Sequence, residues 1–131
     1  MVRLAFLTAL VAISGSALAA QEAELLTGEK LRKAVSGKTV YLMTPLGTEI
    51  PIRYRPNGQM LGRTSASLAA LGGESVSSDT GRWWVVRERL CQRWNNWVDG
   101  RSYCYKFRMT GEAVQWQRND GTSGSARIAS K

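Results

Sequence analysis

Apolar and polar residues alternate along two neighbouring segments, 89–94 and 101–108. Side chains alternate across a β-strand, so every second residue of such a segment lies on the same face. One face then carries Leu90, Gln92, Trp94, Tyr103, Tyr105 and Phe107. The other face carries Arg89, Cys91, Arg93, Cys104, Lys106 and Arg108. The pattern therefore predicts a β-hairpin with an aromatic-rich face and a basic face that holds both cysteines.

The two cysteines suggest a register for this hairpin. If Cys91 lies directly opposite Cys104, residues 92, 93 and 94 pair with 103, 102 and 101, and residues 95–100 form the connecting loop. The same register sets Arg89 against Lys106, and like charges directly opposite each other are unfavourable. The basic face is therefore interpreted in two ways, as a solvated surface or as a binding surface for an anionic partner.

Shorter segments of the same kind fill most of the remaining chain. We expect strands at 39–43, 49–55, 60–63, 83–86, 113–118 and 125–128, separated by turns rich in Gly, Pro and Asn. Pro51 either weakens its strand or places it on an edge. Residues 87–89 form a tight turn or continue the strand. Residues 64–78 are rich in Ser, Ala and Gly and are interpreted as a loop, with a lid as the alternative.

One short helix is expected before the first strand. Apolar residues recur at 31, 34 and 35, Thr27 is suited to the N-cap, and Ser36-Gly37 is suited to end the helix. A helix this short is marginal alone and must pack on another element. We expect Leu25, Leu31 and Val35 to cover one end of a barrel.

These elements together predict a mainly β protein. It is a small antiparallel meander of about eight strands with one short N-terminal helix. Since few long crossovers are available, the sheet is expected to close into a barrel or to roll strongly, which removes exposed strand edges.

The first 19 residues have the features of a secretory signal peptide. Arg3 precedes an apolar run from Leu4 to Ile13, and Ala17-Leu18-Ala19 is suited to cleavage. The run is shorter than the roughly 20 residues that span a membrane. We therefore expect residues 1–19 to be removed and residues 20–131 to form a single small β-barrel-like domain in the periplasm or outside the cell. In such a compartment Cys91 and Cys104 are best explained as one disulfide bond.

The chain is basic, and its charge is concentrated in its second half. It carries 18 Lys and Arg against 10 Asp and Glu, a net charge of +8. Loss of Arg3 leaves 17 against 10, or +7, of which residues 82–131 account for +6 with 10 basic and 4 acidic side chains. This excess favours an anionic partner. For an exported protein the candidates are an anionic polysaccharide, lipopolysaccharide or an acidic surface of an envelope protein, whereas nucleic acid is not expected.

Several short motifs together resemble a group of exported proteins. Thr-Gly-Arg-Trp-Trp-Val, Leu-Cys-Gln-Arg-Trp and Cys-Tyr-Lys-Phe occur in that order at 80–85, 90–94 and 104–107. This order is similar to small exported β-proteins of alphaproteobacteria with a GxWxV … LCxxW … C pattern, most of which have no assigned function. The Gly-x-Trp element also resembles that of lipocalins, where it lies on the first strand, whereas here it lies in mid-chain. The resemblance implies a small exported β-barrel.

The sequence offers little support for catalysis. It contains no His, so the usual general base is missing, and no nucleophile or nucleotide motif is present. Most acidic residues, Asp79 included, lie in or near expected turns. With no His and two Cys, a zinc site is not expected. Residues 119–124 faintly resemble a calcium loop, but a plain turn is the favoured interpretation. We therefore expect no enzyme, no metal and no cofactor.

The tryptophans leave two functional interpretations. We expect Trp94, Trp116 and one of the adjacent pair Trp83 and Trp84 in the core, because adjacent residues of one strand cannot both point inward. Trp97, in the expected hairpin loop, either folds back over the barrel end or is exposed for binding. The first interpretation is a barrel that binds an anionic or amphipathic envelope molecule, with Arg89, Arg93, Trp97, Lys106 and Arg108 as candidate binding residues. The alternative is a protein-interaction module, such as an inhibitor of a secreted hydrolase or an accessory subunit of an envelope complex. An open apolar cavity would favour the first, and a filled barrel with a flat exposed patch around Trp97 would favour the second.

Overall fold

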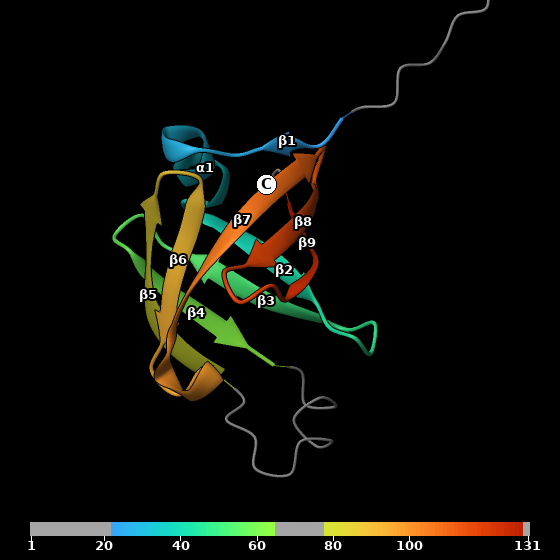
Figure 1. Ribbon diagram of the computed structural model, residues 1–131. Helices are drawn as coiled ribbons and strands as arrows, with labels where there is room; N and C mark the ends of the chain where they lie inside the picture. The colour runs from blue at the N-terminus through green and yellow to red at the C-terminus, as the bar shows by residue number, and fades with distance from the viewer. Residues whose placement is uncertain (1–21, 65–77, 130–131) are drawn as a thin grey trace, which may run out of the picture.

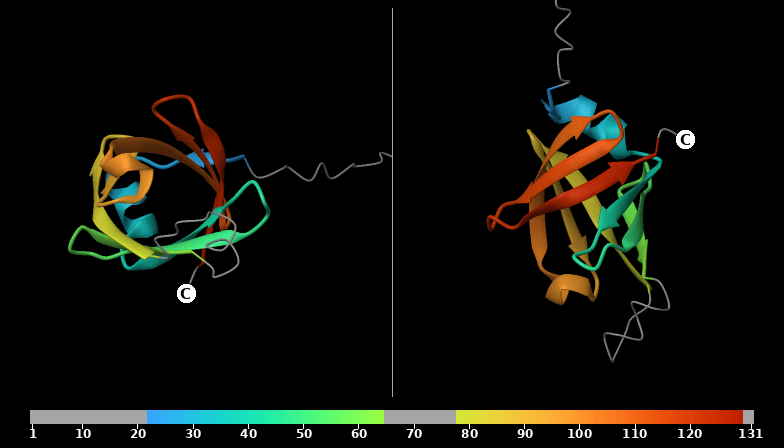
Figure 2. Two further views of the ribbon diagram at one scale, coloured as in Figure 1. Left: turned by 90° about the horizontal axis from the view of Figure 1, so that it is seen from below. Right: turned by 90° about the vertical axis from the view of Figure 1, so that its right-hand side faces the viewer.

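The described residues form a closed antiparallel β-barrel, as the sequence predicts. The computed structural model describes residues 22–64 and 78–129. Its eight barrel strands are β2 (Lys38–Met43), β3 (Glu49–Tyr54), β4 (Gln59–Arg63), β5 (Ser78–Val86), β6 (Arg89–Trp94), β7 (Ser102–Thr110), β8 (Ala113–Arg118) and β9 (Ser123–Ile128). Each strand pairs with the next, and β9 pairs back with β2 to close the ring (Figures 1 and 2). The predicted signal peptide and nearly all of the predicted loop or lid at 64–78 lie outside the described residues.

Two further elements precede the barrel. The two-residue strand β1 (Glu24–Leu25) pairs with the end of β7, and α1 (Gly28–Val35) covers one end of the barrel (Figure 1). Leu31 and Val35 of α1 are fully buried, as predicted, whereas Leu25 is half-buried on β1. Thr27 occupies the N-cap in an extended conformation, but its side chain makes no capping hydrogen bond. The helix is therefore held by its buried face rather than by that cap.

The structure decides between the alternatives that the sequence leaves open for residues 87–89 and for Pro51. Residues 87 and 88 form a tight turn between β5 and β6, with Arg87 at a φ of 54°. Pro51 lies inside β3, opposite Tyr41 of β2, but beyond Ile52–Gly62, the last pair that β3 makes with β4. Because Pro51 has a strand neighbour on one side only, its missing N–H removes no hydrogen bond from the β3–β4 ladder.

The hairpin register follows the cysteines. Cys91 lies opposite Cys104 and is bonded to it, and the next two pairs are residues 92 with 103 and 93 with 102. The ladder ends there, one pair earlier than predicted, because β7 begins only at Ser102. On the other side of β6, Trp94 still pairs with Gly81 of β5. The 3₁₀ turn η1 (Trp97–Gly100) lies within the predicted loop.

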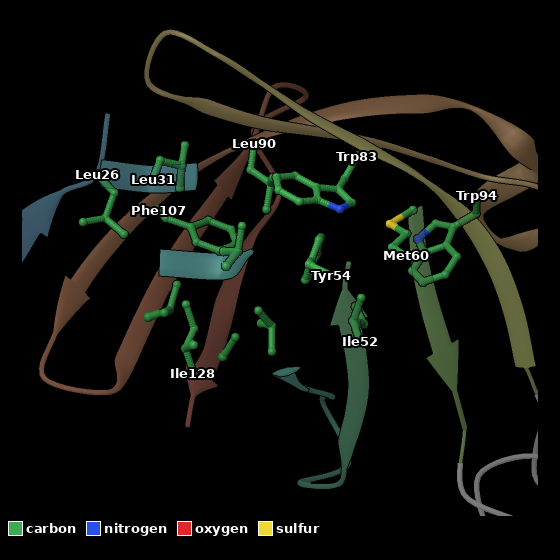
Figure 3. Close-up of a cluster of buried hydrophobic side chains, with 14 residues drawn as sticks. Leu26, Leu31, Ile52, Tyr54, Met60, Trp83, Leu90, Trp94, Phe107 and Ile128 are labelled. Atoms are coloured by element: carbon green, nitrogen blue, oxygen red, sulfur yellow. The ribbon is translucent and has the colours of Figure 1, made fainter. Parts of the chain in front are cut away.

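The inner face of the barrel is apolar, and its most tightly packed part lies next to α1. Leu31 and Leu90 are fully enclosed there, beside Leu26 and Phe107 (Figure 3). Val114 of β8, which pairs with Met109 next to the β1 pairing, is fully enclosed as well. On the hairpin, Phe107 is buried and Arg108 is exposed, as predicted, while Tyr103, Tyr105 and Lys106 are all half-buried. The adjacent tryptophans divide as expected, with Trp83 buried and Trp84 38% exposed.

Candidate functional site

The half of the barrel away from α1 encloses a cavity of about 400 Å³. Its wall is mainly apolar and aromatic, with side chains from β2, β3, β6, β7, β8 and β9 that include Leu42, Ile50, Ile52, Trp94, Phe107 and Trp116. Trp97 and Val98 of η1 line its mouth, where Val98 is exposed. A closed barrel of eight strands is wide enough to hold one small ligand when its side chains do not fill it.

Two wall glycines explain why the large tryptophans leave this space open. A Cβ atom built on Gly124 would lie 2.4 Å from Cζ2 of Trp116, and one built on Gly62 would lie 2.4 Å from Cζ3 of Trp97. The indole rings therefore lie against the backbone of the wall at positions where any side chain would displace them. Trp94 packs on Trp97 with ring centroids 4.7 Å apart. The aromatic side chains thus line the cavity and do not fill it.

Asp79 holds the loop that carries Trp97. Its carboxylate, on β5 and 6% exposed, accepts hydrogen bonds from the backbone N–H groups of Asn96 and Trp97, each at 2.8 Å. The side chain of Asn96 and the N–H of Thr80 donate to the other oxygen. Burial alone would raise the pKa of Asp79, but these hydrogen bonds together hold the pKa below its ordinary value. Trp97 is therefore fixed over the barrel end, the first of its two interpretations.

A polar pair forms the inner boundary of the cavity. The hydroxyl of Tyr54 on β3 donates to Oε1 of Gln92 on β6 at 2.7 Å. Burial raises the pKa of the Tyr54 phenol far above its usual range, so the group keeps its proton and remains a donor. The Tyr54 ring also packs edge-on against Trp83 with centroids 5.7 Å apart. Both side chains are thus fixed by the wall behind them.

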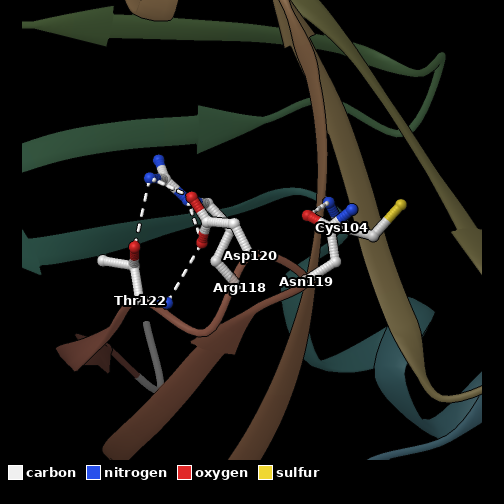
Figure 4. Close-up of polar contacts among 5 residues, drawn as sticks. All are labelled: Cys104, Arg118, Asn119, Asp120 and Thr122. Atoms are coloured by element: carbon white, nitrogen blue, oxygen red, sulfur yellow. Dashed lines mark hydrogen bonds and ion pairs between the residues drawn. The ribbon is translucent and has the colours of Figure 1, made fainter.

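A second polar group in the lining is Arg118 of β8, which is paired with Asp120 (Figure 4). Nε and Nη2 of Arg118 donate to the two carboxylate oxygens of Asp120 at 2.9 and 2.7 Å. Asp120 raises the pKa of Arg118, and Arg118 holds the pKa of Asp120 well below its usual range. Burial raises the pKa of Tyr105, which lies beside Arg118. Because Asp120 matches the charge of Arg118, this part of the lining adds no net charge to the cavity.

Comparisons with known proteins do not place the chain in a family. No family model, curated protein or solved structure matches it. What the chain binds therefore has to be inferred from its own residues. In the ranges 22–64 and 78–129, no three His, Cys, Asp or Glu side chains gather in an arrangement that could hold a metal ion. Across these same ranges no helix is long and apolar enough to cross a membrane.

The candidate binding residues do not form one site. Arg89 and Lys106 line a polar depression of about 250 Å³ on the outer surface, together with residues 117–119 and 121. Arg93 instead donates from Nε to the carbonyl oxygen of Gly100 at 2.8 Å, which ties η1 to β6. Arg108 is exposed farther along β7, opposite Leu25 of β1. Trp97 lies in the cavity wall, on the inner side of the barrel.

Two polar groups, the Tyr54–Gln92 pair in the cavity lining and Asp79 behind the η1 loop, cannot be found from the sequence. Alternation places Gln92 on the aromatic-rich face, but its partner Tyr54 is 38 residues away in the chain, so no local pattern links them. The sequence around Asp79 predicts a turn, but Asp79 is buried on β5 and its carboxylate accepts hydrogen bonds from backbone N–H groups 17 and 18 residues away. Only the Arg118–Asp120 pair has a local signal, since an acid two residues after an arginine within a turn is suited to pair with it.

Proposed function

We propose that the protein binds one small amphipathic molecule in the hollow half of its barrel and is not an enzyme. The observation that carries this proposal is the cavity of about 400 Å³ with its apolar, aromatic wall and its open mouth beside η1. Ligand pockets in proteins are typically about 300–1,000 Å³, mostly apolar and furnished with few polar groups. Burial of apolar ligand surface against this wall supplies the affinity.

The volume limits the size of the ligand. If each non-hydrogen atom needs about as much room as a water molecule, roughly 30 Å³, the cavity holds on the order of a dozen such atoms. Among the described lining residues the ionisable groups are Tyr54, Tyr105 and Arg118, the two tyrosines with raised pKa values and the arginine paired with Asp120. None of them is suited to exchange protons near neutral pH. This supports binding rather than catalysis.

The proposal includes export of the protein, with an envelope molecule as ligand. It rests on the signal-peptide features of residues 1–19 and on the Cys91–Cys104 disulfide, a bond that persists in oxidising compartments. N-terminal sequencing of the protein recovered from the periplasm and from the medium tests it. A chain that retains residues 1–19 in the cytoplasm would overturn this part.

The binding test compares two variants, one with a bulky side chain inside the barrel and one with the same side chain on its outer surface. Ala126 lines the cavity from β9, whereas Ala113 of β8 is exposed. With a methyl ketone of about ten carbons as probe, measured by tryptophan fluorescence, Ala126→Phe should weaken binding at least tenfold because the new ring occupies the cavity. The matched control Ala113→Phe should bind as the unmodified protein does. Equal binding by both folded variants would place the ligand elsewhere.

A second candidate function uses the outer surface. Arg89 and Lys106 share the polar depression of about 250 Å³, and the chain has a net charge of +8. An anionic polysaccharide or lipopolysaccharide would turn the repulsion between these side chains into attraction. Its binding should weaken as salt screens the charges, over a Debye length of about 8 Å at physiological ionic strength.

The test compares two charge removals. The double variant Arg89→Ser with Lys106→Ser should lose binding of an acidic polysaccharide or of lipopolysaccharide at low salt. The control Arg108→Ser removes an exposed charge outside the depression and should bind nearly normally. If both variants bind equally well, or if the unmodified protein binds neither polymer at low salt, the depression is only a solvated surface.

The protein-interaction alternative has less support. It rests on a flat exposed patch around Trp97, but Trp97 is half-buried and packs on Trp94 in the cavity wall. The open cavity favours the small-molecule function.

A further inference from the structure

Gln92 is an unusual residue for the inside of a barrel. It lies on the inward face of β6 between Leu90, which is fully buried, and Trp94, and it is only 7% exposed. Moving an amide from water into such surroundings is unfavourable unless its hydrogen bonds to water are replaced. The side chain carries one acceptor and two N–H donors that need partners.

The acceptor end has its partner. Oε1 receives the hydroxyl proton of Tyr54 at 2.7 Å, and Tyr54 is itself held against Trp83. This bond fixes the orientation of the amide, with its oxygen toward Tyr54 and its nitrogen away from it.

The donor end has no protein partner in the described part of the chain. Nε2 of Gln92 donates to no residue within 22–64 or 78–129. Every fully enclosed side-chain nitrogen and oxygen of these residues does have a partner, so Nε2 is not fully enclosed by protein. Gln92 lines the cavity on the inward face of β6, so the cavity is the open space within reach of Nε2.

We infer that the cavity selects a neutral molecule with an oxygen acceptor, such as a ketone, ester or amide carbonyl, which receives a hydrogen bond from Nε2 of Gln92. This inference rests on the proposed binding function and names the chemistry of its ligand. The apolar remainder of the molecule lies against the indoles of Trp94 and Trp116.

The charge of the lining favours a neutral ligand over a carboxylate. Arg118 is the cation among the described lining residues, and its guanidinium already binds both oxygens of Asp120. A carboxylate beside Gln92 would lose its hydration without gaining an unpaired cation, which is costly in apolar surroundings. A carbonyl oxygen loses less on leaving water, and the Gln92 donor replaces its hydrogen bond.

The experiment compares two probes of the same shape. The first is a methyl ketone of about ten carbons, and the second is the alkene in which a CH₂ group replaces the ketone oxygen. We expect the protein to bind the ketone about tenfold more tightly, the factor that corresponds to one hydrogen bond of about 1.4 kcal/mol. Gln92→Leu should remove this preference while still binding the alkene. The matched control Gln115→Leu, at an exposed position of β8, should keep it.

The outcomes separate this inference from the proposed function. Equal binding of ketone and alkene by the unmodified protein would overturn the inference and leave the cavity as a binding site. Tighter binding of the fatty acid of equal length than of the ketone would also overturn it. If the unmodified protein binds neither probe, or if it binds them and Ala126→Phe binds them equally well, the proposed function itself fails.

Discussion

The two halves of the barrel are built from the same eight strands but use their inward side chains differently. Next to α1, aliphatic residues such as Leu31, Leu90 and Val114 interdigitate and leave no accessible surface of their own. Toward η1 the side chains are larger, yet a cavity of about 400 Å³ remains. The comparison shows that side-chain size alone does not decide whether a barrel is filled. Gly62 and Gly124 let the indoles lie against the wall, and this placement keeps the centre open.

The two halves also differ in what holds them together. The half beside α1 supplies the close packing that stabilises a small domain. The hollow half gives up part of that packing, and specific ties hold its shape: the hydrogen bonds of Asp79 to the η1 loop, the bond from Arg93 to Gly100, and the disulfide between β6 and β7.

The largest expected difference between the halves is in the stability that is lost when a leucine is shortened to alanine. Leu90→Ala should lower the free energy of unfolding by about 2–5 kcal/mol, because it leaves an enclosed void. Leu42→Ala removes a half-buried side chain that already borders open space, so about 1 kcal/mol is expected. Urea denaturation measures both values. Equal losses would mean that the two halves are packed alike.

Removal of the disulfide tests how much the hollow half depends on its covalent tie. The bond joins residues 13 apart, and the loop that it closes contains η1. Cys91→Ser should lower the free energy of unfolding by roughly 2–4 kcal/mol, because the unfolded chain gains conformational freedom. Cys104→Ser should cost about the same. Titration of two reactive thiols in the native, exported protein would contradict this prediction.

A methyl group added to a glycine of the barrel wall should strain the hollow half and reduce the volume of its cavity. Gly124→Ala places a Cβ atom where the Trp116 ring lies, so the ring must move toward the cavity. We expect a loss of about 1–3 kcal/mol in stability and weaker binding of the ketone probe. Ser123→Ala, at the exposed neighbouring position, should change neither. Unchanged binding by Gly124→Ala would show that this glycine does not keep the cavity open.

The smallest expected effect concerns the tie between Asp79 and the η1 loop. Asp79→Asn keeps the shape but loses the charge and replaces one acceptor oxygen by an NH₂ group. Two of the four hydrogen bonds that Asp79 accepts are then lost and the other two weaken, so about 1–2 kcal/mol of stability is lost at neutral pH. Asp99→Asn, at an exposed position of the same loop, should cost almost nothing.

This tie also gives a pH dependence with a defined sign. Because the pKa of Asp79 is lower in the folded protein than in the unfolded chain, its contribution is complete above the unfolded value of about 3.9. The contribution is lost as the pH falls through the lower folded value. Denaturation curves below about pH 4 should therefore converge for the unmodified protein and Asp79→Asn. A gap that persists at low pH would exclude ionisation as its cause.

The sequence predicts the fold well because its signals are local. Alternation identifies most of the strands, and the two cysteines give the β6–β7 register at Cys91–Cys104 and the next two pairs. The start of β5 was missed because Ser78 to Gly81 resemble a loop in composition, and β-propensity is a weak guide where pairing decides. The cavity could not be predicted, since Gly62 meets Trp97 only after β4 and the η1 loop come together.

The order of pairing around the ring has a kinetic consequence. Among the described barrel strands every ladder joins neighbours in the chain except the last, in which Val40 of β2 meets Ile128 of β9. Contacts between distant residues slow folding, because the entropy of the intervening chain is lost before the contact forms. The hairpins can therefore assemble early. Formation of the β2–β9 pairing is expected to limit the rate at which this protein reaches its native state.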